Sequence, residues 1–285
     1  MARPSGIIFL FSVFGLLACA ASGGRPEVVP NLCTIPLTRV LRIPIATLAP
    51  QTTVESPNPA SANLMVSKGA ADEPPEGPDG FDVLDDGSLL ITDPLRSRLA
   101  SFDSQGKFRN EWKIGFPADS VTVAANGQVL VREASSGQLH PYNQKGQSEP
   151  AQGAQPSPRL EARVLAGQNR GTIGPSLAIQ FDKPGETLLS LESLSADPKG
   201  DTYVALETTA KGPAAEAINL NKYVRRYSSE GALVCEIADI PLDYYISPVD
   251  EFRVHRGVVY QLQTTGSEVR VNVWDTNQPC SRPTH

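Results

Sequence analysis

The feature that most constrains this chain is an aromatic residue that begins a short polar turn and returns about every 43 residues. Successive copies are separated by 40, 39, 46 and 47 residues. In four of the five copies a glycine follows four residues later, at a turn position where a positive φ costs glycine little. This regular punctuation indicates repeated β-hairpins, and we expect the leading aromatic residues to be structural. They are Phe102, Tyr142, Phe181, Tyr227 and Trp274.

A second turn signal precedes the first in four of the units, and short runs of strand-forming residues flank both turns. Each unit therefore reads as four short strands, the pattern of a propeller blade, whose two faces both need a neighbour. We expect an all-β fold, a β-propeller. Residues 33–285 divided by the mean repeat favour six four-stranded blades, and counting from Gly80 leaves five possible. The second turns are Asp85-Asp86-Gly87, Ala125-Asn126-Gly127, Pro198-Lys199-Gly200 and Arg256-Gly257.

Four stretches depart from this rhythm. Residues 50–80 are too rich in proline for central strands and read as an exposed loop with one possible strand at Leu64–Ser67. Leu37–Leu48 alternates enough to be a strand or hairpin that completes the last blade. Thr208–Leu220 is rich in alanine and predicts a short helix on a loop, and Glu149–Gly174 fits the repeat poorly.

The first unit, Gly77–Phe108, resembles an NHL repeat, because it combines a Gly-hydrophobic-Asp start, a turn glycine, an Asp-terminated strand and a Phe-Asp-x-x-Gly hairpin. NHL repeats are blades of six-bladed propellers, so the resemblance implies that architecture. In propellers generally, the loops between second and third strands and the linkers between blades share the face where ligands bind. The residues that this resemblance places there are Asp93, Arg96, Glu133, Glu207, Asp243, Tyr244 and Tyr245.

Each of these candidate binding residues also has a structural interpretation. Tyr244 and Tyr245 are either anchors for a partner or plugs in the crevice between two blades. Asp93 either contributes to binding or caps its turn.

The N-terminal sequence predicts where in the cell the protein is located. An apolar run, Ile7–Cys19, follows Arg3 and has the length of a signal-peptide core, too short for a membrane-spanning helix. Its end, Leu-Leu-Ala-Cys, resembles the bacterial lipobox, which implies a signal peptide over residues 1–18, lipidation of Cys19 and an anchored tether over 19–32. We therefore expect a lipoprotein of the bacterial cell envelope, held at the outer membrane by its lipid and facing the periplasm or the cell surface. The alternative is an ordinary secretory signal cut at a nearby alanine.

Three cysteines remain beyond Cys19, and an oxidising envelope compartment permits disulfides. Cys33 and Cys280 lie near the two ends of the expected propeller domain, residues 33–285, so a bridge between them would join the termini of a circular fold. Cys235 would then be a buried free thiol. Three independent reduced cysteines are the equal alternative.

The sequence carries no recognisable reaction chemistry. Its formal charge of −6 and the absence of a Lys/Arg run argue against nucleic-acid binding. We identify no catalytic constellation, metal-ligand spacing or cofactor motif, and the lipid is the only attached group expected. Three interpretations stay open: a non-catalytic propeller that binds an envelope protein, peptide or glycan; a hydrolase similar to the gluconolactonase group, with calcium or another divalent metal in the channel; and a structural component of an envelope assembly.

Overall fold

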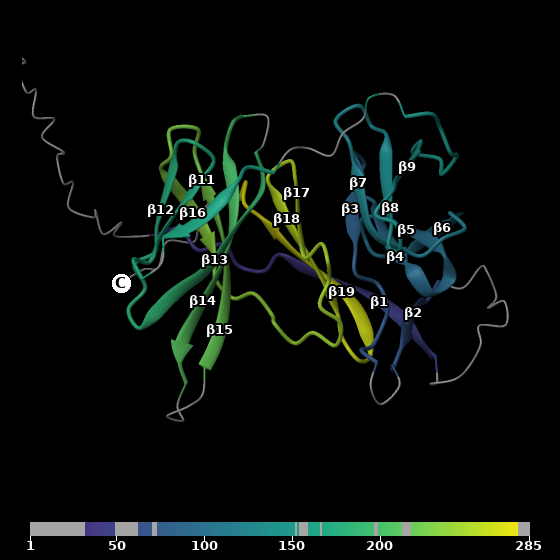
Figure 1. Cartoon of the computed structure of the whole chain (residues 1–285), viewed down its shortest axis with the longest axis horizontal. Helices are drawn as coiled ribbons and strands as arrows, with labels where there is room; N and C mark the ends of the chain where they lie inside the picture. The colour runs from purple at the N-terminus through teal and green to yellow at the C-terminus, as the bar shows by residue number, and fades with distance from the viewer. Residues whose placement is uncertain are drawn as a thin grey trace, which may run out of the picture. The chain divides into compact units, whose positions relative to one another are not determined.

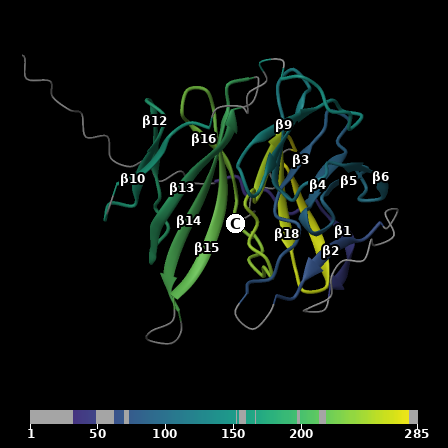
Figure 2. The same cartoon turned by 45° about the vertical axis from the view of Figure 1, so that its right-hand side comes forward.

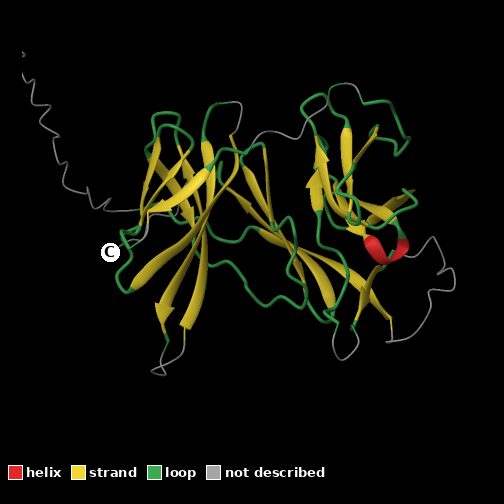
Figure 3. Ribbon diagram, in the orientation of Figure 1, coloured by secondary structure: helices red, strands yellow, loops and turns green. Residues whose placement is uncertain are grey.

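The computed structural model describes residues 32–48, 62–69, 73–151, 153, 159–165, 167–196, 199–212 and 218–278. In this part of the chain the regular elements are β-strands, with one 3₁₀ turn, η1 (Pro94–Arg96) (Figure 3). No helix within these residues is long and apolar enough to cross a membrane. The prediction of an all-β fold is confirmed.

The strands of the described residues form five sheets, which are the blades of a β-propeller (Figures 1 and 2). Consecutive strands joined by tight turns within a blade pair antiparallel, as those turns require. Blade 1 contains β3 (Phe81–Val83), β4 (Leu89–Asp93), β5 (Arg98–Phe102) and β6 (Phe108–Lys113). Blade 2 contains β7 (Ala118–Val123), β8 (Val129–Glu133) and β9 (Leu139–Tyr142), and blade 3 contains β10 (Ala162–Leu165), β11 (Arg170–Ile173) and β12 (Leu177–Gln180).

The last two blades are built from longer strands. Blade 4 contains β13 (Glu186–Ala196), β14 (Thr202–Lys211), β15 (Ile218–Tyr227) and β16 (Leu233–Ile237). Blade 5 has the strand order β17 (Phe252–His255), β18 (Val258–Thr264), β19 (Glu268–Asp275), β1 (Arg39–Leu48) and β2 (Leu64–Ser67). It therefore joins the two ends of the described chain in one sheet.

Neighbouring blades meet along their first strands and bury the repeated aromatic residues. β3 contacts β7 and β17, and β13 contacts β10 and β17. The leading aromatic residues of all five units are at most 7% exposed, which confirms their predicted structural role. Each fills the space between sheets where a flat blade face would otherwise contact water.

The first strand closes the fold, as Leu37–Leu48 predicted. β1 pairs antiparallel with β19, from Arg39 opposite Val273 to Pro44 opposite Glu268, and then pairs parallel with β2. β2 corresponds to the strand predicted at Leu64–Ser67. Alternate residues Leu41 and Ile43 point into the core between blades 5 and 1, where Ile43 is fully buried.

Two expectations are corrected by this arrangement. The described residues form five sheets, the alternative that counting from Gly80 left open, and not the favoured six, because the strands before Gly80 add to blade 5 and do not form a blade of their own. The helix expected over Thr208–Leu220 does not extend over the described ends of this stretch, because Thr208–Lys211 belongs to β14 and pairs with Ile218–Asn221 of β15, while residues 213–217 lie outside the described part of the chain. The hydrogen-bonded ladder sets the conformation of Ala210 despite the helical preference of alanine.

The predicted signal peptide, the lipidation site Cys19 and most of the expected tether lie outside the described residues, and so does Cys280. The bridge between Cys33 and Cys280 therefore stays a prediction. Cys33 is buried near Cys235, which is a buried free thiol, and burial raises the pKa of that thiol to about 11. At neutral pH Cys235 is therefore protonated and behaves as a small apolar side chain.

Candidate functional site

Each blade places one charged residue on or up to three residues before its first strand, and in blade 4 this residue lies in the middle of β13. These residues are Asp79, Asp119, Arg159, Glu192 and Asp250, and each precedes a positive-φ turn glycine by eight residues, or by seven in the last case. Because the blades are arranged around a common axis, equivalent positions converge, and these five side chains form what we call the charge ring. It lies at the end of the blades where the β4–β5 and β8–β9 loops and the linker 238–251 are found, which we call the linker face.

Arg253 of β17 holds the buried side of the charge ring together. Its guanidinium lies 2.7 Å from Asp250 and 3.7 Å from Asp82 of β3, and it donates a hydrogen bond to the Val121 carbonyl oxygen at 3.2 Å. Blades 5, 1 and 2 are thereby joined by one side chain. Burial disfavours the charge of Arg253, but the two carboxylates outweigh burial and raise its pKa.

The accessible side of the charge ring contains two further arginines. Arg159 lies 3.2 Å from Asp250 and also pairs with Glu192, while Arg132 of β8 lies 2.8 Å from Asp119. The side chains of Arg159 and Glu192 are 43% and 48% exposed. This side of the ring can therefore be reached from solvent, whereas Arg253 cannot.

Two carboxyl groups of this region are held in unusual states. Burial raises the pKa of Asp79 to about 7, and the carboxylates of Asp119 and Asp250 add to the rise against the hydrogen bond from Thr92. Burial also raises the pKa of Asp82, although Arg253 and the amides of Val123 and Val83 oppose this. Asp79 therefore exchanges its proton near neutral pH, where most aspartates are ionised.

The raised pKa of Asp79 predicts that the free energy of unfolding falls as pH rises from about 4 to about 7. The unfolded chain ionises this carboxyl near pH 4, but the folded protein holds the proton until about pH 7. Asp79→Asn should remove this loss, so its stability relative to the parent should rise by about 1–3 kcal/mol between pH 4 and pH 8. Urea unfolding at several pH values measures this difference.

Asp103→Asn is the matched control for Asp79→Asn. The backbone amides of Lys107 and Gln105 lower the pKa of Asp103, so its contribution to stability has the opposite dependence on pH. If Asp79→Asn and the parent protein showed parallel pH profiles, the raised pKa would be wrong.

A polar cleft adjoins the charge ring between blades 4 and 5. Ser190, Glu207 and Lys222 are direct neighbours across β13, β14 and β15, and both Ser190 Oγ and Lys222 Nζ lie 2.9 Å from the Glu207 carboxylate. Lys222 also pairs with Glu251, which accepts a hydrogen bond from the Tyr244 hydroxyl. The cleft has a volume of about 130 Å³, and Glu192 of the charge ring lines it.

The cleft brings together two residues that the sequence had singled out, Glu207 and Tyr244. Burial and the Glu251 carboxylate raise the pKa of the Tyr244 hydroxyl, which stays protonated and also accepts a hydrogen bond from Gln261 at 2.6 Å. The Nζ atom of Lys222, from blade 4, lies 5.7 Å from the centre of the Tyr244 ring, so Tyr244 contacts both blades, as its interpretation as a plug expects. Tyr245 is 38% exposed and is fixed through its backbone amide, which donates to the Thr264 carbonyl oxygen at 2.8 Å.

The other predicted residues lie in separate local networks. Asp93 is fully buried, pairs with Arg98 at 2.8 Å and with Arg96 at 3.5 Å, and accepts a hydrogen bond from the Met65 amide. Arg96 donates to the Asn63 carbonyl oxygen at 2.5 Å. Both side chains therefore fasten β2 to blade 1, so Asp93 has a structural role, although its carboxylate makes no capping hydrogen bond to η1 as the turn interpretation expected.

Glu133 and Asp243 remain on the linker face. Glu133 accepts hydrogen bonds from Ser136 at 2.8 Å and Ser135 at 3.0 Å, and these bonds lower its pKa. Asp243 accepts a hydrogen bond from Gln263 and lies 3.3 Å from Arg270. The structure does not join either residue to the charge ring through a direct contact among the described residues.

The charge ring does not have the donor set of a divalent-metal site. Carboxylates converge there, as a lactonase-like channel would require, but Arg132, Arg159 and Arg253 occupy the positions beside them. In the described ranges, no group of three or more His, Cys, Asp or Glu side chains is arranged to hold a metal ion. The Asp86 carboxylate stabilises the turn between β3 and β4, because it accepts hydrogen bonds from the amide and hydroxyl of Ser88.

Comparison with known proteins gives distant structural similarity alone. No family model and no curated protein matches the chain. Streptogramin B lyase is 10% identical, with 69% of this chain and 93% of that chain covered and a TM-score of 0.33. A DUF4221 family member from Bacteroides vulgatus is 8% identical, with 86% of this chain and 98% of that chain covered and a TM-score of 0.32. A gluconolactonase from Xanthomonas campestris is 11% identical, with 89% of this chain and 90% of that chain covered and a TM-score of 0.27. These values carry no conclusion about activity.

Proposed function

We propose that this protein is a lipoprotein of the bacterial cell envelope whose propeller binds a protein, peptide or glycan partner without catalysing a reaction. The observation that carries the binding role is the linker face, where exposed Arg159 and Glu192 are held in place by ion pairs across several blades. A charged surface fixed in this way is ready for recognition before a partner arrives. The lipid expected on Cys19 would keep that surface at the membrane.

The chemistry of the linker face favours binding over catalysis. Glu207, Glu251 and Asp250 are paired with lysine or arginine, and within the described residues no histidine makes a hydrogen bond to a serine, threonine or cysteine side chain. A nucleophile with its general base would need such a contact. Tyr245 supplies an exposed aromatic group in the linker 238–251, of the kind that anchors partners in interfaces.

Photo-crosslinking in intact cells, followed by fractionation of membranes, tests both halves of this proposal. The parent protein should be in the membrane fraction and crosslink to an envelope component. Cys19→Ala should move the protein to the soluble fraction, and Tyr245→Ala combined with Glu192→Ala should reduce the crosslink at least tenfold, because an anchor and a rim charge are removed together. Val234→Ala, at another exposed apolar residue on β16, should leave it unchanged.

Two results would contradict the proposal. Unchanged crosslinking by the Tyr245→Ala, Glu192→Ala variant would exclude the linker face as the binding surface, and membrane association of Cys19→Ala would exclude the lipid anchor. Hydrolysis of lactones that a chelator abolishes would favour the lactonase-like alternative.

A further inference from the structure

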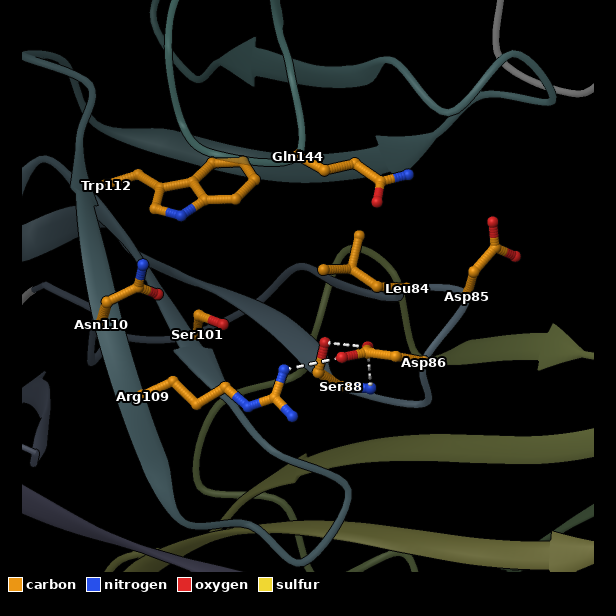
Figure 4. A pocket seen from close by; sticks show the side chains of 9 residues that line it. All are labelled: Leu84, Asp85, Asp86, Ser88, Ser101, Arg109, Asn110, Trp112 and Gln144. Atoms are coloured by element: carbon orange, nitrogen blue, oxygen red, sulfur yellow. Dashed lines mark hydrogen bonds and ion pairs between the residues drawn. The ribbon is translucent and has the colours of Figure 1, made fainter.

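A second concave site lies at the opposite end of the blades from the linker face. It is a pocket of about 420 Å³ between blades 1 and 2, and nine residues line it (Figure 4). The volume falls within the range of about 300–1,000 Å³ found for small-molecule sites. The lining residues are Leu84, Asp85, Asp86, Ser88, Ser101, Arg109, Asn110, Trp112 and Gln144.

The shape of the pocket depends on one glycine in the β9 turn. A Cβ at Gly146 would come within 2.5–2.7 Å of the indole ring of Trp112, so this glycine lets the ring lie directly against the turn of blade 2. Trp112 and Leu84 then form an apolar wall, while Gln144 from the same turn closes the pocket from the side of blade 2 (Figure 4). The site is therefore formed by two blades and preformed in the folded chain.

Three polar groups that line the pocket have no hydrogen-bond partner among the described residues. The Ser101 hydroxyl, the Asn110 amide and the Trp112 indole N–H make no hydrogen bond with any group in the described part of the chain. Ser101 and Trp112 are nevertheless 95% or more buried, with exposures of 5% and 4%. Ser101 and Trp112 are thus largely buried side chains whose polar atoms line the cavity without a protein hydrogen bond, and Asn110 adds an exposed amide, so all three groups are available to a bound molecule or to the water that it displaces.

The charges around the pocket are already compensated. Asp86 lies 2.7 Å from Arg109 across the mouth of the pocket, and Asp85 lies 3.1 Å from Arg256. A phosphate or carboxylate ligand would meet the two aspartates, and an ammonium ligand would meet Arg109. The pocket therefore favours a neutral ligand.

We propose that this pocket binds a neutral mono- or disaccharide unit. Sugar hydroxyls both donate and accept hydrogen bonds, which matches a hydroxyl, an amide, an indole donor and the Asp86–Arg109 pair around one cavity. The C–H face of a sugar ring would cover Leu84 and the edge of Trp112. The proposal concerns a different surface from the linker face and stands independently of the partner proposed there.

Tryptophan fluorescence and titration calorimetry of the full-length protein test the proposal. The chain has two tryptophans, and Trp274 is only 1% exposed and lies outside the pocket. Titration with a panel of neutral sugars, including glucose, N-acetylglucosamine and chitobiose, should give a saturable change for at least one sugar. The fluorescence change should persist in Trp274→Phe and disappear in Trp112→Phe.

Asn110→Ala supplies the decisive variant, because Asn110 is exposed enough for its loss to leave the fold intact. This variant should raise the dissociation constant of the bound sugar at least tenfold in calorimetry, whereas Gln105→Ala, an exposed amide of the same blade outside the pocket, should leave it unchanged. Three results would overturn the proposal: no binding of any neutral sugar by either method, equal affinities of the Asn110→Ala and Gln105→Ala variants, or tighter binding of glucose 6-phosphate or glucosamine than of the neutral sugars.

Discussion

Arg253→Met should lower the free energy of unfolding by about 3–5 kcal/mol, because it leaves buried carboxylates without their counter-charge. Asp82 and Asp250 lie 3.7 Å and 2.7 Å from the guanidinium, which also contacts the Phe81 ring at 5.8 Å. Methionine fills much of the space but supplies no charge and no hydrogen bond to the Val121 carbonyl oxygen. Urea unfolding at pH 7 should show a lower midpoint with an unchanged m-value.

Two variants separate this effect from a general loss of an arginine. Arg42→Met removes a 60% exposed arginine paired with Glu268 and should change stability by less than about 0.5 kcal/mol. The double variant Arg253→Met, Asp82→Asn should recover part of the loss, because it removes one of the orphaned charges. Equal stability of Arg253→Met and Arg42→Met would show that the charge ring does not hold the blades together.

Ile43→Ala should lower the free energy of unfolding by about 2–5 kcal/mol, because it opens a cavity at the seam where the fold closes. Ile43 is fully buried in the cluster that contains Phe81, Leu262 and Val271, from blades 1 and 5. Its strand, β1, pairs with β19 on one side and β2 on the other. The measurement is the urea midpoint of the full-length protein, followed by circular dichroism.

Thr47→Ala, at an exposed position of the same strand, is the control for Ile43→Ala. It preserves the backbone pairing with Val66 and should change stability by less than about 0.5 kcal/mol. If Ile43→Ala left the free energy of unfolding unchanged, β1 would contribute little to the stability of the fold.

The sequence was informative wherever a local rule decides the structure. Turn glycines such as Gly87, Gly106 and Gly127 adopt the positive φ that their hairpins require, and the aromatic residues ahead of the turns are buried. The alternation of Leu41 and Ile43 with exposed neighbours predicted a strand before any partner was known. These features depend on a few adjacent residues, so a single sequence reveals them.

The number of blades required information that no local pattern contains. Residues before Gly80 have strand character, but whether they form a blade or complete another one depends on β19, more than two hundred residues later. The strand conformation of Thr208–Lys211 has the same origin, because it depends on pairing with β15.

The candidate site was only partly predictable. Glu207 and Tyr244, both candidates from the sequence, lie in one network of ion pairs and hydrogen bonds. The sequence analysis does not predict the charge ring, although each of its residues lies seven or eight positions before a turn glycine. That spacing was a usable signal once the blades were aligned on their turns. The sequence could not identify Ser101 as a pocket residue. Its hydroxyl lines a pocket only because Trp112 and Gln144 lie around the same cavity, and Gln144 comes from the next blade.

The pairing of β1 with β19 sets the order in which the molecule can be completed. Arg42 of β1 and Glu268 of β19 are 226 positions apart. Of the described strands, β1 is synthesised first and β19 last, so the apolar side of β1 is covered only after β19 has been made. Until then Leu41 and Ile43 stay without their neighbours on β19, and the growing chain has an unsatisfied edge. Loss of the final strand would therefore also deprive the first strand of its antiparallel partner, and damage at either terminus has the same consequence for the whole circle.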